Sequence, residues 1–502
     1  MAKRHCLPCP NNISLLKTYH EMIKNKSIKP SEIIKNLLIT RPVRSLSGII
    51  NISLLTKPYP CPGKCLYCPI EKGIPKSYVS GEPAVERAKK LNYDPYLQVK
   101  RRIEMLETEG HPTDKIELRI VGGTWSYYPR QYQNWFVKRC FTACNQAEIQ
   151  NQKSKIQNKT LKNEQKINEG TKHRAVGLSI ETRPDFITPE EIKHLRELGV
   201  TMVELGVQSI YDDVLKKNLR GHGVAETITA TKLLKDAGFK VLYQMMPNLP
   251  GSNLKRDEKM FEELFKNPNF RPDLLKIYPC ALLKEAPLYQ IWQQGKYKPY
   301  NQSQLISLIK EIKKIIPYYV RIQRISRDIP SSSIIAGPAK ISNLRQLLLE
   351  KMKKENWHCR CIRCREVREK YNPREKPYLF RDNYVASGGK EIFLSFENKK
   401  RTKLYSLLRL RITSENKAII REIHTYGLQL PIKKINRSDG SSTSIISPQH
   451  KGLGKKLIKE AEKITKKEFN LKKIAVISGI GVKPYFRILG YKLENTYMVR
   501  LL

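Results

Sequence analysis

Residues 58–69 of the chain read PYPCPGKCLYCP. This short loop places Cys61, Cys65 and Cys68 in a C-x3-C-x2-C pattern. Three thiolates with this spacing can hold three irons of a cubane and leave the fourth iron free to bind a small ligand. A zinc knuckle is the alternative, but zinc prefers four ligands and only three cysteines are local. The pattern therefore favours a 4Fe-4S cluster.

Apolar strands and helical segments alternate after this loop, between residues 116 and 325. One helix is well delimited, because Thr188 can cap it, Pro189 suits its first turn and Gly199 suits its exit. Such alternation predicts a parallel sheet, open or curled into a barrel, with functional residues at the carboxyl ends of the strands. The expected strands cover 116–123, 175–182, 202–209, 240–247, 274–280 and 320–325.

A cysteine loop followed by a strand–helix repeat resembles the radical S-adenosylmethionine (SAM) enzymes. In that family the open iron binds the methionine group of SAM, and one electron from the cluster releases a 5′-deoxyadenosyl radical. Glycine backbone at a strand end can approach the methionine group closely. Any one polar residue at a strand end could be a satisfied core group, but together they predict the lining of a SAM or substrate site. These residues are Gly122, Gly123, Thr124, Glu181, Arg183, Glu204, Gln208 and Gln244.

A second motif lies near the end of the chain, where Gln449, Gly452 and Gly454 form Q-x-x-G-x-G before an amphipathic helix. Glycines there let backbone amides turn toward a pyrophosphate at the positive end of the helix. The strand at 474–479 and the aromatic segment at 483–491 follow in the order found in GNAT acetyltransferases, whose coenzyme A loop this motif resembles. A dinucleotide-binding fold does not fit, since no acidic residue follows a second strand at the required distance.

A third motif, C-x-C-x2-C, consists of Cys359, Cys361 and Cys364. It predicts a zinc site at the junction between domains, with Cys280 or His358 as the fourth ligand. Unligated cysteines in a basic loop are the alternative.

The net charge of the 502-residue chain is +46, which points to a polyanionic partner such as nucleic acid. A genomic bias toward lysine is the alternative. No run of about 18 apolar residues predicts a membrane helix, and the N-terminus lacks the apolar core of a secretory signal. We therefore expect a cytoplasmic protein without a membrane partner.

The sequence predicts an α/β protein in four parts: a basic arm at 1–45, to which the family resemblance given below assigns tRNA binding, a partial (β/α) radical SAM barrel at 46–340, a cysteine-rich zinc-binding junction at 341–379 and a GNAT acetyltransferase domain at 380–502. Within the barrel, residues 145–172 are rich in Asn, Gln and Lys, and we expect a flexible insertion there.

The pairing of these two domains resembles the family of the Elongator catalytic subunit and its stand-alone prokaryotic relatives. Ordered blocks carry the resemblance, among them GHPTDKIELRIVGGT, IETRPD, ELGVQSIYDDV, MMPNLPG, REIHTYG and QHKGLG. It implies a tRNA uridine modification enzyme. A radical made from SAM takes hydrogen from the methyl group of acetyl-CoA, the resulting carbon adds to carbon 5 of the wobble uridine, and hydrolysis of the thioester leaves a carboxymethyl group.

The resemblance also implies site residues. The cluster ligands fall on Cys61, Cys65 and Cys68, and the catalytic positions on Lys115, Tyr485 and Phe486. Family members often have Tyr-Tyr at the last two positions and a longer gap between the first two cysteines. The acetyl-CoA site falls on Lys115, Glu422, Ile423, His424, Thr425, Gln449, Gly452, Leu453, Gly454, Lys455, Tyr485 and Phe486.

The expected partners are the anticodon stem-loop of tRNA, an electron donor and a second copy of the chain in a homodimer. The uridine must leave its stack to meet the radical, so the loop has to enter the mouth of the barrel. Two competing hypotheses are a protein lysine acetyltransferase with a relic radical SAM barrel and a tRNA-binding scaffold without catalysis. Intact cluster cysteines argue against both.

Overall fold

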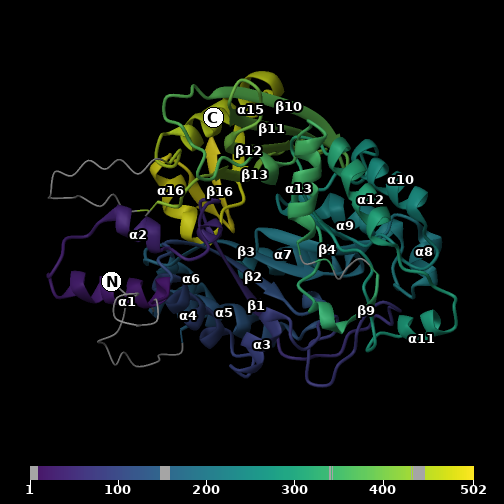
Figure 1. The fold of residues 1–502 in the computed structure, drawn as a ribbon. Coiled ribbons are helices and arrows are strands. Elements are labelled where there is room, and N and C mark those ends of the chain that lie inside the picture. Colours follow the sequence, from purple (N-terminus) through teal and green to yellow (C-terminus); the bar gives the residue numbers. More distant parts are fainter. Residues whose placement is uncertain (1–9, 147–158, 338–340, 342, 431, 433–446) are drawn as a thin grey trace.

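Two seven-stranded sheets form the body of the protein, the first in purple to teal and the second in green and yellow (Figure 1). The described part of the predicted arm is helical, with α1 (Asn12–Lys24) and α2 (Glu32–Leu38). The structure is a computed structural model and describes residues 10–146, 159–337, 341, 343–430, 432 and 447–502.

The first sheet is parallel throughout and forms a half-barrel, as the strand–helix repeat predicts. Its order is β1-β2-β3-β4-β5-β6-β8. Each expected strand is present, within a few residues of its expected bounds. The strands are β1 (Ile50–Leu55), β2 (Lys115–Val121), β3 (Arg174–Thr182), β4 (Met202–Gln208), β5 (Lys240–Met245), β6 (Leu274–Ile277) and β8 (Arg321–Arg324). A separate antiparallel pair joins β7 (Leu282–Leu283) to β9 (Ile334–Ala336).

Local sequence signals set the helices that cover this sheet. In α7 (Pro189–Leu198), the side chain of Thr188 accepts from the amide of Glu191, and Gly199 ends the helix at a φ of 88°. Apolar faces of these helices pack on the outer face of the sheet and form the main core. The other helices are α3 (Pro83–Lys89), α4 (Pro95–Thr108), α5 (Arg130–Gln146), α6 (Leu161–Asn168), α8 (Asp212–Lys217), α9 (Val224–Asp236), α10 (Leu254–Lys266), α11 (Leu288–Gln293) and α12 (Gln302–Ile315).

The prediction of a flexible insertion at 145–172 is wrong for the described residues of this segment. Residues 147–158 lie outside the described part, but Asn145 lies in the last turn of α5 and the segment 161–168 forms α6. Asn168 is fully buried. Its side-chain nitrogen donates to the carbonyl of His173 at 3.1 Å, and that of Asn145 donates to the carbonyl of Glu164 at 2.9 Å. Because these amides are satisfied internally, a polar segment packs inside the domain.

The second sheet is mixed and follows a short junction made of α13 (Leu344–Lys354) and α14 (Ile362–Arg365). Its order is β10-β11-β12-β13-β14-β16-β15, antiparallel except for the parallel pair β13–β14. The strands are β10 (Tyr378–Ala386), β11 (Gly389–Glu397), β12 (Leu404–Ile412), β13 (Ala418–Thr425), β14 (Lys473–Val476), β15 (Lys492–Glu494) and β16 (Tyr497–Leu501). The helices α15 (Leu453–Phe469) and α16 (Lys483–Ile488) belong to the same unit.

A buried ionic network joins the two sheets. Arg421 on β13 donates to both carboxylate oxygens of Asp273, at 2.8 and 2.6 Å, just before β6. Arg411 on β12 donates to Asp236 at 2.6 Å. The carboxylate of Glu391 on β11 accepts from Arg411 and Arg421, each at 2.9 Å. Asp236 is partly exposed, but the other paired charges are buried, and together they hold the two units in one fixed arrangement.

None of the helices in the described ranges is both long and apolar enough to cross a membrane.

Candidate active site

The cysteine loop lies at the carboxyl ends of the first sheet. Cys65 and Cys68 are buried and Cys61 is half-buried. Among the described residues, the group of thiols identified as close enough for a single metal ion consists of the junction cysteines and does not include the three of this loop. A single zinc ion needs its sulfurs close together, about 2.3 Å from one centre, whereas a cubane binds each thiolate to a different iron. The geometry therefore fits the cluster that the spacing predicts.

Arginine side chains surround the middle cysteine. Burial alone would raise the pKa of Cys65, but the charge and hydrogen bond of Arg220, 3.5 Å from the sulfur, bring it below its ordinary value. Burial raises the pKa of Cys68 to about 12. Sequence reasoning missed Arg220, because it lies far along the chain and no local motif announces it.

The Gly122-Gly123 pair ends β2 with φ values of 135° and 103°, in the region that favours glycine. Its two amides donate to one oxygen of Glu181, at 2.8 and 2.9 Å. Tyr78 donates to the same oxygen at 2.9 Å. The glycine turn therefore fixes a carboxylate at the mouth of the barrel, close to the cysteine loop.

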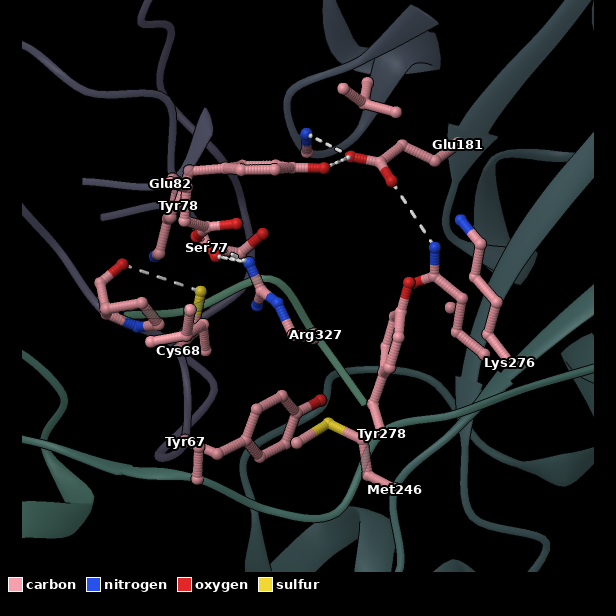
Figure 2. A pocket seen from close by; sticks show the side chains of 18 of the residues that line it. Tyr67, Cys68, Ser77, Tyr78, Glu82, Glu181, Met246, Lys276, Tyr278 and Arg327 are labelled. Atoms are coloured by element: carbon pink, nitrogen blue, oxygen red, sulfur yellow. Dashed lines mark hydrogen bonds and ion pairs between the residues drawn. The ribbon is translucent and has the colours of Figure 1, made fainter. Parts of the chain in front are cut away.

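We call the space enclosed here the cysteine cavity, of about 270 Å³ (Figure 2). It brings together the cysteine loop and seven of the eight residues predicted for SAM, with Gly122 directly beside them. In Figure 2, Tyr78, Glu181, Lys276, Tyr278 and Arg327 surround the open centre of the cavity. The seven residues are Gly123, Thr124, Glu181, Arg183, Glu204, Gln208 and Gln244.

Several buried polar atoms of the cysteine cavity have no hydrogen-bond partner among the described residues. They are Tyr67 Oη, Arg183 Nη1, Glu204 Oε1 and Gln208 Oε1. Unpaired polar atoms are costly to bury, so a cavity that carries both donors and acceptors suits a polar ligand. SAM, with its amino, carboxylate and ribose groups, fits this requirement. Lys276, which donates to Glu204, was not predicted from the sequence.

A second cavity of about 500 Å³ lies between the amino ends of β2–β5 and the second sheet, and we call it the interdomain cavity. All twelve residues predicted for acetyl-CoA line it: Lys115, Glu422, Ile423, His424, Thr425, Gln449, Gly452, Leu453, Gly454, Lys455, Tyr485 and Phe486. Residues separated by more than 300 positions thus meet in one place.

Gln449 connects the two sheets at this cavity. Its side-chain nitrogen donates to the carbonyls of Gly48 and Thr425, both at 3.0 Å. Its oxygen accepts from Lys115 Nζ at 2.8 Å. Burial lowers the pKa of Lys115 to about 8. The lysine is therefore near the point of losing its charge at neutral to mildly alkaline pH.

The two aromatic residues of α16, Tyr485 and Phe486, differ in their exposure and therefore in what each can contact. Tyr485 is 37% exposed, whereas Phe486 is 1% exposed and belongs to the core of the second sheet. The Phe486 ring packs edge-on against Tyr485 and Tyr491. A hydroxyl at position 486 would be buried, so phenylalanine there fills the core and leaves Tyr485 as the accessible aromatic group.

Cys359, Cys361 and Cys364 have their sulfurs within 4.8 Å of one another. Neither predicted fourth ligand belongs to this group. Cys280 lies in a separate apolar cluster with Leu249 and Tyr297. His358 is not one of the described residues whose ligand atoms lie close enough together to bind one metal ion. Instead, Lys313 Nζ on α12 lies 3.4 Å from Cys364 Sγ. That lysine is 46 positions before the first cysteine of the motif, so no local pattern connects the two.

Two models of known protein families match most of the part of the chain that forms the first sheet and its helices. The radical SAM superfamily model covers residues 59–264, and the Radical_SAM C-terminal domain model covers residues 272–354. The chain is therefore a radical SAM enzyme.

Relatives of known name narrow the assignment. The tRNA uridine(34) acetyltransferase of Methanocaldococcus infernus is 45% identical over 498 residues, covering 95% of this chain and 90% of the relative. Elongator complex protein 3 of Homo sapiens is 38% identical over 492 residues, covering 93% and 86%. A solved structure of the archaeal M. infernus Elp3 with an N-terminal deletion superposes with a TM-score of 0.77 at 44% identity and covers 91% of this chain and all of that one. The chain belongs to the family of tRNA uridine(34) acetyltransferases and Elongator complex protein 3, as the sequence resemblance implies.

Proposed function

We propose that this chain is a tRNA uridine(34) acetyltransferase that places a carboxymethyl group on carbon 5 of the wobble uridine, using SAM and acetyl-CoA. One observation carries the proposal. The cysteine cavity and the interdomain cavity lie at opposite ends of the same parallel strands, and each gathers the residues that one cofactor needs. A cluster and SAM, when bound, supply a radical able to take hydrogen from a methyl group.

The residues of the chain have separate tasks in this reaction. Cys61, Cys65 and Cys68 hold the cluster, and Arg220 favours the thiolate form of Cys65 that binds iron. Glu181, fixed by the glycine turn, offers its carboxylate to the amino group of SAM. The half-buried rim of the cysteine cavity admits the uridine and excludes bulk water from the reacting atoms.

Support for a GNAT fold in the second unit comes from its strands. The strand β13 pairs with β14 only from Ala418 to Ile420, and from there to Thr425 it is paired only with β12 on its other side. The two strands therefore separate beside Gly452, which starts α15 at a φ of 79°. A gap between parallel strands that faces a helix N-terminus suits the pyrophosphate and pantetheine of coenzyme A.

Support for a tRNA partner comes from arginines beside the cysteine cavity. Arg87 lines the cavity, and no carboxylate pairs with Arg87 or Arg102 within the described part of the chain. Burial and the neighbouring charges of Arg87, Arg44 and Arg41 lower the pKa of Arg102 to about 10. Arg87 therefore connects the cavity to a group of mutually repelling cations, and such a group is suited to binding phosphates.

The deciding experiment uses anaerobically reconstituted protein with tRNA, SAM, a reductant and acetyl-CoA, followed by nucleoside analysis. Carboxymethyluridine and 5′-deoxyadenosine are expected from the native chain and from Cys140→Ala, which changes a buried core cysteine. Both products are expected to disappear in Cys65→Ala. Acetylated peptides that persist in Cys65→Ala would instead support a protein lysine acetyltransferase, and bound tRNA without any product would support a scaffold.

A pH titration tests the part played by Lys115. Its ammonium form, which attracts the coenzyme phosphates, prevails below pH 8 and is lost above it because the pKa is about 8. The affinity for acetyl-CoA is therefore expected to be highest below pH 8 and to fall as the pH rises to 9.5. Calorimetric titration of the native chain and of Lys115→Met checks this. A native profile as flat as that of the variant would contradict it.

The junction cysteines support a structural zinc in the proposed assembly. Three thiolates within 4.8 Å offer three of the four donor groups that zinc prefers. Lys313, whose Nζ donates to Cys364 Sγ at 3.4 Å, adds a positive charge that offsets the thiolates and is not itself a zinc ligand. About one zinc per chain is expected by metal analysis, and Cys361→Ser is expected to lose it and to lower the melting temperature. Cys144→Ser, in the core of the barrel, is the control and should keep the metal.

A further inference from the structure

The two cavities are separated inside the barrel by a thin layer of side chains. Alternate residues of a strand face the lumen. On β5, Lys240 lines the interdomain cavity, Gln244 lines the cysteine cavity, and Leu242 lies between them. We call the dividing layer the septum. It consists of Glu117, Arg119, Met202, Leu242, Leu274 and Gln323.

One side of the septum is a polar latch on β2. Glu117 lines the interdomain cavity and Arg119 lines the cysteine cavity. Arg119 Nε donates to Glu117 Oε1 at 2.9 Å. The side-chain oxygen of Gln323 on β8 accepts from Arg119 Nη2 at 2.7 Å, in the amide orientation that satisfies both groups. The Glu117–Arg119 pair thus lies between the two cavities on this side of the septum.

The other side of the septum is apolar. Met202, Leu242 and Leu274, on three neighbouring strands, form a buried cluster of their own, distinct from the main core outside the sheet. An apolar, water-poor wall suits a thioester and the methyl group it carries, whereas a charged nucleotide would pay a desolvation cost there.

The reaction requires the two cavities to meet. Hydrogen transfer needs the reacting atoms about 3–3.5 Å apart. Lys240 and Gln244, one at each cavity, are four residues apart on β5, or about 13 Å at the rise of a strand. The buried network around Asp273 opposes a hinge motion of the two units, because separating them would leave buried charges without their partners.

We infer that the barrel lumen is a binding passage for the acyl-thioester arm of the coenzyme, closed by the Glu117–Arg119 pair and lined by Met202, Leu242 and Leu274. The inference rests on the proposed function. The nucleotide part of the coenzyme remains in the interdomain cavity, and only the narrow arm crosses the septum. Arg119 and Glu117 are positioning residues that control entry of the arm.

Acyl-chain length tests the passage in protein that lacks cluster and SAM. Arg119→Ala removes the latch, so a six-carbon acyl chain gains access to the apolar wall. The affinity for hexanoyl-CoA relative to acetyl-CoA is expected to rise at least about tenfold, given the gain per buried methylene. Arg101→Ala, on the exposed face of α4, is the matched control and should leave the ratio unchanged. An unchanged ratio in Arg119→Ala would overturn the passage.

Isotope transfer tests the same passage in reconstituted enzyme. With trideuterated acetyl-CoA, deuterium moves from the acetyl methyl group to the 5′ carbon of 5′-deoxyadenosine. Leu242→Phe is expected to lower this transfer at least about tenfold by filling the lumen. SAM cleavage measured without acetyl-CoA reports separately whether the cluster site of the variant is intact. Leu349→Phe, on an exposed position of α13, is the control.

The outcomes are distinguishable. Native deuterium transfer in a folded Leu242→Phe variant overturns the passage and leaves the proposed function intact. No transfer in the native enzyme overturns the proposed function itself. If Leu242→Phe does not fold, the acyl-chain ratio in Arg119→Ala decides.

Discussion

Gly122→Ala is expected to lower SAM cleavage by about 100-fold or more, the loss that follows when reacting groups are displaced by about 1 Å. A β-carbon at position 122 would lie 1.9 Å from Thr56 Oγ1 and 3.1 Å from the backbone nitrogen of Thr56. The φ of 135° is also unfavourable for alanine. The turn must therefore shift, and the amide that donates to Glu181 at 2.8 Å shifts with it.

The measurement is 5′-deoxyadenosine formed per minute by reconstituted enzyme, with iron content recorded for each variant. Gly295→Ala is a matched control, because its φ is 72° but a β-carbon there would meet nothing within 4 Å. It should retain native activity. The added substitution Thr56→Ala removes the nearest clashing atom and is expected to restore part of the activity. Native cleavage by Gly122→Ala alone would show that the turn does not position SAM.

Asp273→Asn is expected to lower the free energy of unfolding by about 3–5 kcal/mol, the cost of breaking a buried ion pair from one side. The carboxylate is fully buried and lies within 3.6 Å of charged nitrogens of Lys235, Arg409 and Arg421. Burial opposes the charge of Asp273, but these three cations hold the pKa of the carboxyl well below its usual range. An amide would leave their charges poorly compensated.

Urea unfolding followed by circular dichroism measures this effect. The control is Asp213→Asn, whose carboxylate is 65% exposed and pairs with Arg256 at 2.8 Å. That exposed pair is expected to contribute less than about 1 kcal/mol. Equal stability losses in the two variants would mean that the network between the sheets contributes no more than a surface ion pair.

Much of the cysteine cavity could be predicted from the sequence, because its signals are local. The spacing of Cys61, Cys65 and Cys68 lies within one loop, and each polar strand end was assigned from its own strand. Parallel strands then bring their carboxyl ends to one edge, so residues far apart in the chain meet without any long-range information. In the interdomain cavity, Gln449, Gly452 and Gly454 were predicted from their local motif. The other residues came from family resemblance, since nothing local connects Lys115 with Gln449.

Three features could not be predicted, for different physical reasons. Lys313 approaches Cys364 only because α12 packs beside the junction. Composition favoured disorder near Asn168, but hydrogen bonding to the buried backbone outweighs the cost of its burial. Arg421 follows an apolar run in β13, and its partner Asp273 is 148 positions away.

The seven residues of β2 have Lys115 at one end and the Gly122-Gly123 turn just beyond the other. Deleting a single residue from this strand would reverse the direction of every side chain on one side of the deletion. Both ligand sites would then lose their alignment at once. Natural length variation is thus expected in surface connections and not in this strand. In a library of single-residue deletions scored for function, no functional variant is expected with a deletion at these positions.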